Sequence, residues 1–119
     1  MNKFFNFLGL VKRSGNLLEG YSKCNDNRNK KPMYMFIISV DASEATKKKF
    51  TKHCEGKKIP YIIDFSKEEL GEAVGRPEVM ILGILDINMA NKLGDIYKEE
   101  KSWFNKAEVT VCQKLEYMS

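Results

Sequence analysis

The sequence predicts an α/β protein, specifically a three-layer α/β/α sandwich. Two observations predict this class. First, residues 33–40 (MYMFIISV) and 79–85 (VMILGIL) are continuous apolar runs, which are typical of central strands covered on both faces. Second, strand-like and helix-like segments alternate along the chain, an order that predicts helices on both sides of one sheet. The length of 119 residues favours a single domain over residues 1–119, with a core of about 2–100 and a C-terminal extension over 101–119.

The N-terminal part predicts a helix, a very short strand and a weak second helix. Phe4, Leu8 and Val11 recur at helical spacing and predict a helix over residues 2–12, ended by Ser14-Gly15. Residues 17–18 predict a short strand. Residues 21–31 (YSKCNDNRNKK) are polar and rich in Asn, which competes with the helix through side chain–backbone hydrogen bonds. They therefore predict only a short or irregular helix.

Two helices and a strand are predicted in the middle of the chain. Asp41 and Glu44 have the spacing of a capping pair, and they predict a helix that runs to about residue 55. Residues 59–63 (IPYII) predict a strand, because β-branched and aromatic residues follow a proline at its entrance. Ser66 and Glu69 predict a capping box, and Gly75 predicts the end of that helix, because glycine adopts the left-handed conformation without a Cβ penalty.

The last predicted elements follow the second apolar run. Asp86 is placed to cap a helix whose apolar residues recur at helical spacing: Ile87, Ala90, Leu93 and Tyr97. We expect Trp103-Phe104 to anchor the end of this region. Residues 109–112 (VTVC) predict an edge strand.

Composition places the chain among ordinary soluble proteins. Hydrophobic residues make up 43% and charged residues 30% of the sequence. No apolar run approaches the roughly 20 residues of a membrane span, and the N-terminal stretch is too short for a signal peptide. The three cysteines, Cys24, Cys54 and Cys112, have no metal-type spacing and fit a reducing compartment, so a cytoplasmic location is expected.

Catalytic motifs are missing from the sequence. It contains no GxGxxG, Walker, HExxH or GxSxG pattern. The sole histidine, His53, adjoins Cys54 on a predicted helix, where neighbouring side chains point in different directions, so we expect an exposed histidine and a packed cysteine. Glu68 and Glu72 form an i, i+4 pair without a second set of metal ligands. The sequence therefore predicts no enzyme, no metal and no cofactor.

The distribution of charge favours an anionic partner, with nucleic acid the first candidate. Residues 1–60 hold 13 Lys/Arg against 5 Asp/Glu, whereas residues 61–119 hold 7 against 11. The simpler alternative is that the lysines are only solvated. Basic residues flank the predicted loops at 12–13, 28–31 and 76, and a helix start at Gly20 can donate backbone N–H groups to phosphate or base edges. This pattern is typical of proteins that read structured RNA.

Several stretches resemble a known family. DASEATKKKF, HCEGKKIPYIIDFSKEELGEAVG, VMILGILD and the LGL-x-x-R-x-G start at residues 8–15 resemble the kink-turn RNA-binding ribosomal protein family, the L-seven-A-e / L-thirty-e superfamily. The likeness is closer to its bacterial YlxQ-type branch and spans about residues 4–98. It implies a sandwich with a mixed, roughly four-stranded central sheet and no catalysis. It also implies binding to kink-turn-like RNA, in ribosomal or regulatory RNA, by a cytoplasmic monomer associated with the ribosome.

The resemblance also implies a two-part RNA site. The loop after the LG-x-A-x-G helix is intact, whereas the segment after Gly20 departs from the family pattern, with Asp26 where a lysine is usual. The residues expected to contact RNA are Arg13, Asn16, Gly20, Ser22, Lys23, Gly75, Arg76 and Pro77. The altered segment 21–31 motivates an alternative: a diverged scaffold of the same fold that has lost kink-turn recognition and binds a protein or another RNA.

Overall fold

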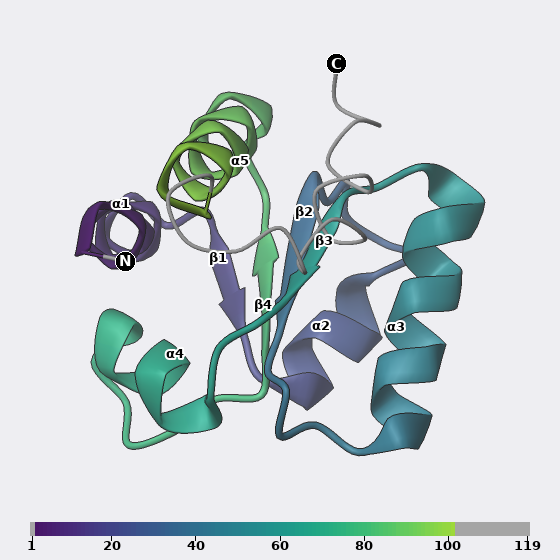
Figure 1. Cartoon of the computed structure of the whole chain (residues 1–119). Coiled ribbons are helices and arrows are strands. Elements are labelled where there is room, and N and C mark those ends of the chain that lie inside the picture. The colour runs from purple at the N-terminus through teal and green to yellow at the C-terminus, as the bar shows by residue number, and fades with distance from the viewer. Residues whose placement is uncertain (1, 102–119) are drawn as a thin grey trace.

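The computed structural model describes residues 2–101, which form one sheet between two layers of helices (Figure 1). The predictions for Trp103-Phe104 and residues 109–112 lie outside the described residues. The described elements, in chain order, are α1 (Asn2–Arg13), β1 (Leu17–Glu19), α2 (Tyr21–Asn27), β2 (Met35–Ile38), α3 (Glu44–Lys57), β3 (Tyr61–Ile63), α4 (Lys67–Val74), β4 (Ile81–Ile84) and α5 (Ile87–Lys101).

The sheet is mixed, with strand order β1-β4-β2-β3. Strand β4 runs antiparallel to both β1 and β2, whereas β2 and β3 are parallel. The expected three-layer sandwich with a mixed, four-stranded sheet is therefore confirmed. At one end of the sheet, the last residues of β1, β2 and β3 lie beside the first residue of β4. We call this end of the sheet the Glu19 edge. The opposite edge, at the starts of β2 and β3, is called the Tyr34 edge.

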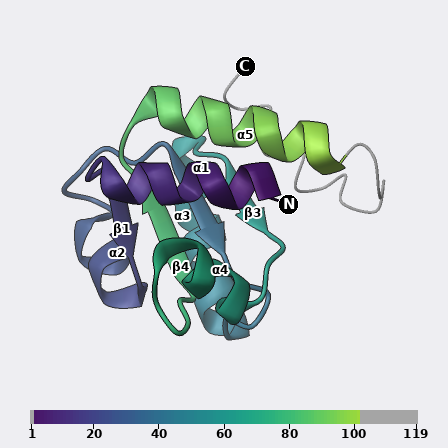
Figure 2. The same cartoon turned by 90° about the vertical axis from the view of Figure 1, so that its left-hand side faces the viewer.

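The core has two parts, one on each face of the sheet. Along β2, Met35 and Ile37 pack with apolar residues of α1, α4 and α5, whereas Phe36 and Ile38 pack with those of α2 and α3. This division follows from the alternation of side chains along a strand. Figure 2 shows α1 and α5 lying side by side over the first face, with α4 beside them. The two apolar runs thus form central strands, as predicted.

Helix α4 begins and ends as the sequence predicts. The Ser66 hydroxyl accepts a hydrogen bond from the Glu69 N–H at 3.0 Å, and the Glu69 carboxylate accepts one from the Ser66 N–H at 2.9 Å. Gly75 has a φ of 77°. Its N–H donates to the Glu72 carbonyl at 3.3 Å and the Arg76 N–H donates to the Gly71 carbonyl at 2.8 Å, the two bonds of a Schellman motif.

Of two predictions about helix starts, one needs correction and one is confirmed. Helix α3 is capped by Ser43, whose hydroxyl accepts from the Thr46 N–H at 3.1 Å, and not by the Asp41–Glu44 pair. Asp41 instead accepts a hydrogen bond at 3.0 Å from the backbone N–H of Lys67, at the start of α4. In α5 the Asp86 cap is confirmed by its bond to the Met89 N–H at 2.9 Å.

Ile87 is the first member of the apolar repeat predicted for this helix, and it is 51% exposed. It is the first residue of α5, next to the loop that leaves β4, whereas the later members of the stripe, Ala90, Leu93 and Tyr97, are buried.

No helix within residues 2–101 is long and apolar enough to cross a membrane.

His53 was predicted to be exposed, yet it is only 9% exposed on α3. Arg28, which follows α2, places its Nη1 at 3.4 Å from the Nδ1 of His53 and shields the ring. Burial lowers the pKa of His53, and the charges of Arg28 and Lys57 lower it further. The neighbouring Cys54 is buried as predicted, and burial together with the charge of Glu55 raises its pKa to about 12. A protonated thiol is a poor nucleophile, so these two residues do not form a catalytic pair.

Replacing Gly71 should destabilise the protein, because its backbone lies against the loop that follows α4. An added Cβ would lie 2.6 Å from the Glu78 Cα and 2.7 Å from the Arg76 carbonyl oxygen. We expect Gly71→Ala to lower the free energy of unfolding by about 1–3 kcal/mol, measured by urea denaturation. The matched control is Gly56→Ala on α3, where a Cβ meets nothing within 4 Å. This change should raise the free energy of unfolding by up to about 1 kcal/mol. Equal effects of the two changes would contradict the close approach.

The stability of the protein should fall as the pH drops below the ordinary pKa of histidine, about 6.5. The lowered pKa of His53 means that the unfolded chain takes up a proton that the folded chain does not. The contribution is therefore fully present above about pH 6.5 and declines below it, by up to about 1.4 kcal/mol per pH unit. Urea denaturation of the native chain and of His53→Gln between about pH 7 and pH 5 checks this. Because the chain has 1 histidine, an unchanged slope in the variant would refute the assignment.

Candidate functional site

The start of α2 lies at the Glu19 edge of the sheet. The helix begins directly after β1, and the turn between them is Gly20, whose φ of 96° and ψ of 162° suit glycine. The Gly20 N–H donates to the Ile81 carbonyl at 2.8 Å, which fixes the turn to β4. No side-chain hydrogen bond caps this helix, and Ser22 and Lys23 in its first turn are exposed. The edge therefore presents polar side chains and backbone donors to solvent.

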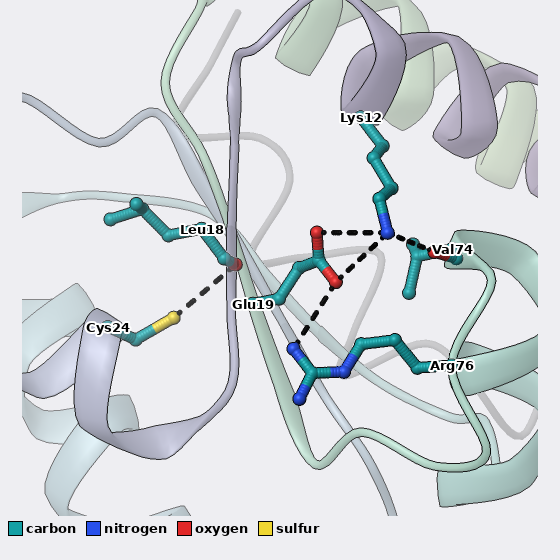
Figure 3. A network of polar contacts seen from close by, with 6 residues as sticks. All are labelled: Lys12, Leu18, Glu19, Cys24, Val74 and Arg76. Atoms are coloured by element: carbon teal, nitrogen blue, oxygen red, sulfur yellow. Dashed lines mark hydrogen bonds and ion pairs between the residues drawn. The ribbon is translucent and has the colours of Figure 1, made fainter.

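Glu19 joins this helix start to the loop that follows α4 (Figure 3). Its carboxylate lies 3.5 Å from the Arg76 Nη1 and 3.4 Å from the Lys12 Nζ. The Lys12 ammonium also donates to the Val74 carbonyl at the end of α4. The Glu19 side chain is only 14% exposed, whereas that of Arg76 is 47% exposed. The carboxylate is thus covered by two cations that still face solvent.

An aromatic ring lies beside the same helix start. Tyr21, the first residue of α2, is exposed, and its ring packs edge-on against Phe50 of α3 at 5.7 Å between centroids. The Lys49 Nζ donates to the Tyr21 hydroxyl at 2.9 Å and lies 5.3 Å from the ring centroid. An exposed ring held in place next to a cation is a surface on which an unstacked base can pack.

The structure brings six of the eight expected residues to the Glu19 edge. They are Gly20, Ser22 and Lys23 from the start of α2, and Gly75, Arg76 and Pro77 from the loop after α4. The two segments meet through the Arg76–Glu19 ion pair.

Asn16 is not brought to this place, whereas Arg13 lies beside the last turn of α4. A Cβ at Gly9 would lie 3.5 Å from the Arg13 Nη1 and 3.5 Å from the Ala73 carbonyl oxygen, so this guanidinium lies between α1 and the last turn of α4. Asn16 lies at the start of β1, at the Tyr34 edge, roughly 13 Å of extended chain from Gly20. Its amide donates to the Ser14 hydroxyl at 2.9 Å. The structure thus separates Asn16 from the other six.

Sequence reasoning missed Glu19, Tyr21 and Lys49 as parts of this edge. Glu19 was not singled out, because its partner Arg76 is 57 residues away in the sequence. Tyr21 and Lys49 come from different helices, and no local spacing signals their contact. The adjacency of Glu19 to Gly20 was the one available clue.

The chain was compared with known families and proteins. The model of the family described as "Ribosomal protein L7Ae/L30e/S12e/Gadd45 family" matches residues 2–94. The RNA-binding protein YlxQ of Enterococcus faecium is 34% identical over 95 residues, which cover 79% of this chain and 90% of that protein. The RNA-binding protein YlxQ of Bacillus subtilis (strain 168) is 29% identical over 91 residues, or 76% of this chain and 91% of that protein.

Solved structures show the same fold. A protein with unknown function from Bacillus halodurans C superposes with a TM-score of 0.75 and 30% identity, covering 79% of this chain and 95% of that one. The Giardia lamblia 15.5kD RNA binding protein superposes with a TM-score of 0.64 and 20% identity, covering 75% and 79%. At this identity, the second likeness shows the fold alone.

Removing the Glu19 charge should weaken the attachment of the loop 75–77 to the end of β1. Glu19→Gln should lower the free energy of unfolding by about 1 kcal/mol, because solvent limits what ion pairs with half-exposed cations contribute. The control is Glu72→Gln, at an exposed position on α4, which should change stability by less than about 0.5 kcal/mol. Urea denaturation of the two variants gives the comparison. If Glu19→Gln is as mild as its control, the ion pairs do not hold the loop.

Proposed function

This chain belongs to the ribosomal protein L7Ae/L30e/S12e/Gadd45 family, and we propose that it is a non-catalytic protein that binds structured RNA containing a kink-turn-like bend. Two relatives carry the name RNA-binding protein, which supports the general class. Recognition of a sharp bend is the finer part of the proposal, and it comes from the motifs of the sequence. The buried, protonated thiols of Cys24 and Cys54 and the uncapped, exposed start of α2 suit binding rather than covalent chemistry.

The observation that carries the proposal is the junction of two distant segments at the Glu19 edge. Glu19, the last residue of β1 and two residues before α2 begins, is ion-paired with Arg76 of the loop 75–77. A bent RNA presents two backbone segments close together, together with unstacked nucleotides. Two protein segments held side by side match that geometry, with Arg76 and Lys23 as the phosphate contacts and Tyr21 as a surface for a base.

The altered α2 gives the proposal a specific form. Asp26 is exposed on α2, where the family pattern has a lysine, so a phosphate near it is repelled rather than attracted. Lys23, one turn earlier, and Lys49, beside Tyr21, supply positive charge at the start of the helix instead. We propose that the RNA contacts the first turn of α2 and the Arg76 loop and avoids the Asp26 side.

The setting proposed for this activity is a cytoplasmic monomer associated with ribosomal RNA. Within residues 1–60, Lys and Arg exceed Asp and Glu by 13 to 5, which suits a large polyanion. Co-sedimentation of the protein with ribosomal particles checks the association. Light scattering of the purified chain checks the oligomeric state.

Titration of the protein with a kink-turn RNA by calorimetry tests the proposal directly. We expect saturable binding, and we expect Arg76→Gln and Lys23→Gln each to weaken it by about tenfold through loss of a phosphate contact. Glutamine is preferred to glutamate at residue 76, because a second carboxylate beside Glu19 would disturb folding.

The matched control is Lys52→Gln, which removes one exposed positive charge from α3 outside the proposed site and should change the affinity by less than about twofold. A straight duplex of the same composition should bind more weakly than the kink-turn. Equal affinity for the bent and straight RNAs would reject kink-turn recognition. Retention of a protein partner after nuclease treatment, with no RNA affinity, would instead support the diverged scaffold.

A further inference from the structure

A pocket lies at the Tyr34 edge, on the opposite side of the sheet from the proposed RNA site. It has a volume of ≈ 400 Å³ and lies between the loop 28–34, the end of α3 and the start of α5. Pockets of about 300–1,000 Å³ are the usual size for small organic ligands. We call this site, defined below by its charged and apolar residues, the basic pocket.

The charged side chains of the basic pocket have one sign. Four cations line it: Arg28, Lys31, Lys57 and Lys58. The lining residues found in the described part of the chain include no Asp or Glu. Positive charges gathered around one cavity repel one another, so an anion bound among them is favoured.

The Arg28 guanidinium is held in position by side-chain contacts, and Lys58 has a fixed backbone. The Arg28 Nε donates to the Asn25 carboxamide oxygen at 3.1 Å, and its Nη1 lies 3.4 Å from the His53 Nδ1. Lys58 has a left-handed backbone with a φ of 57°, and its N–H bonds to the Cys54 carbonyl at the end of α3. A guanidinium held on one side keeps further donors for a phosphate group.

The remaining walls of the basic pocket are largely apolar. They include Tyr34, which precedes β2, Ile59 and Pro60, which precede β3, and Ile87, the first residue of α5. Ile87 is half exposed although it belongs to the apolar stripe of α5. Packing against a flat ligand would remove this apolar surface from water.

We infer that the basic pocket binds a nucleotide, with its phosphate among Arg28, Lys31, Lys57 and Lys58 and its base against Tyr34 and Ile87. A nucleotide combines a compact anion with a flat, weakly polar ring, and the pocket offers a partner for each part. The nucleotide is either free or a single unpaired residue of an RNA strand. The site does not depend on the proposed kink-turn contact, since the two lie at opposite edges of the sheet.

The test is a titration of the ¹⁵N-labelled full chain with adenosine 5′-monophosphate, followed by amide chemical shifts. We expect shifts at Tyr34 and Lys58 and none at Ser22 and Arg76. Adenosine alone and inorganic phosphate alone should each bind at least about fivefold more weakly, because each engages one half of the pocket. The inference would be overturned if inorganic phosphate bound as tightly as the nucleotide does, or if the chemical-shift changes were confined to residues of the Glu19 edge.

A pair of charge-matched double variants sharpens the result. Lys31→Gln/Lys57→Gln should lower the affinity for the nucleotide by about tenfold. Lys48→Gln/Lys52→Gln removes the same charge from α3 outside the pocket and should change that affinity by less than about twofold. Thermal melting confirms that both variants fold. Equal weakening in the two would show a general charge effect and refute the pocket.

Two further measurements separate the source of the nucleotide and the two proposals. The first measurement uses a 5′-phosphorylated single-stranded oligonucleotide. If it shifts the same amides and binds more tightly than the monophosphate, RNA is the source of the nucleotide. If the monophosphate binds more tightly, the source is a free nucleotide. Absence of pocket shifts with both probes refutes the site. Kink-turn affinity of Lys31→Gln/Lys57→Gln should be retained within about threefold, so failure of one proposal is distinguishable from failure of the other.

Discussion

The pairing of β2 with β4 is the constraint on which the rest of the structure depends. All four residues of each strand are buried, because helices cover both faces. Gly83 shows how closely the layers approach: a Cβ there would lie 3.1 Å from the Met33 sulfur and 3.5 Å from that of Cys24. With this pair fixed, β1 and β3 can add only at its sides. The loops that leave the sheet are thereby collected at two opposite edges.

Local sequence signals predicted the parts of the fold that depend on neighbours in the chain. The apolar runs, the Ser66–Glu69 capping box and the glycine end of α4 need only residues within one element, and all three are confirmed. The Asp41 cap and the exposure of His53 were wrong for the opposite reason. Asp41 bonds to the backbone of Lys67, and His53 is covered by Arg28. Both partners belong to other elements, which no local pattern reveals.

The two candidate sites differ in how much the sequence disclosed. At the Glu19 edge, a glycine before a helix and a basic loop after another are recognisable motifs, and the fold brings the six residues expected from them to the same end of the sheet. The basic pocket has no such motif, because its residues come from the loop after α2, the end of α3 and the start of α5. In the sequence alone, Lys57-Lys58 are typical of a turn, and Ile87 is typical of the apolar stripe of a helix. Only the packing of the Tyr34 edge combines them.

Glu19 gives the protein an internal counterion. Arg76 and Lys12 are already neutralised in part by its carboxylate, so a phosphate that reaches Arg76 exchanges one anionic neighbour for another. Because the vacated Glu19 carboxylate then attracts a cation from solution, the net release of ions is smaller than for the contact of a fully solvated cation. The dependence of affinity on ionic strength would therefore report fewer phosphate contacts than the interface contains. Discrimination among RNAs at this edge would rest on shape more than on bulk charge.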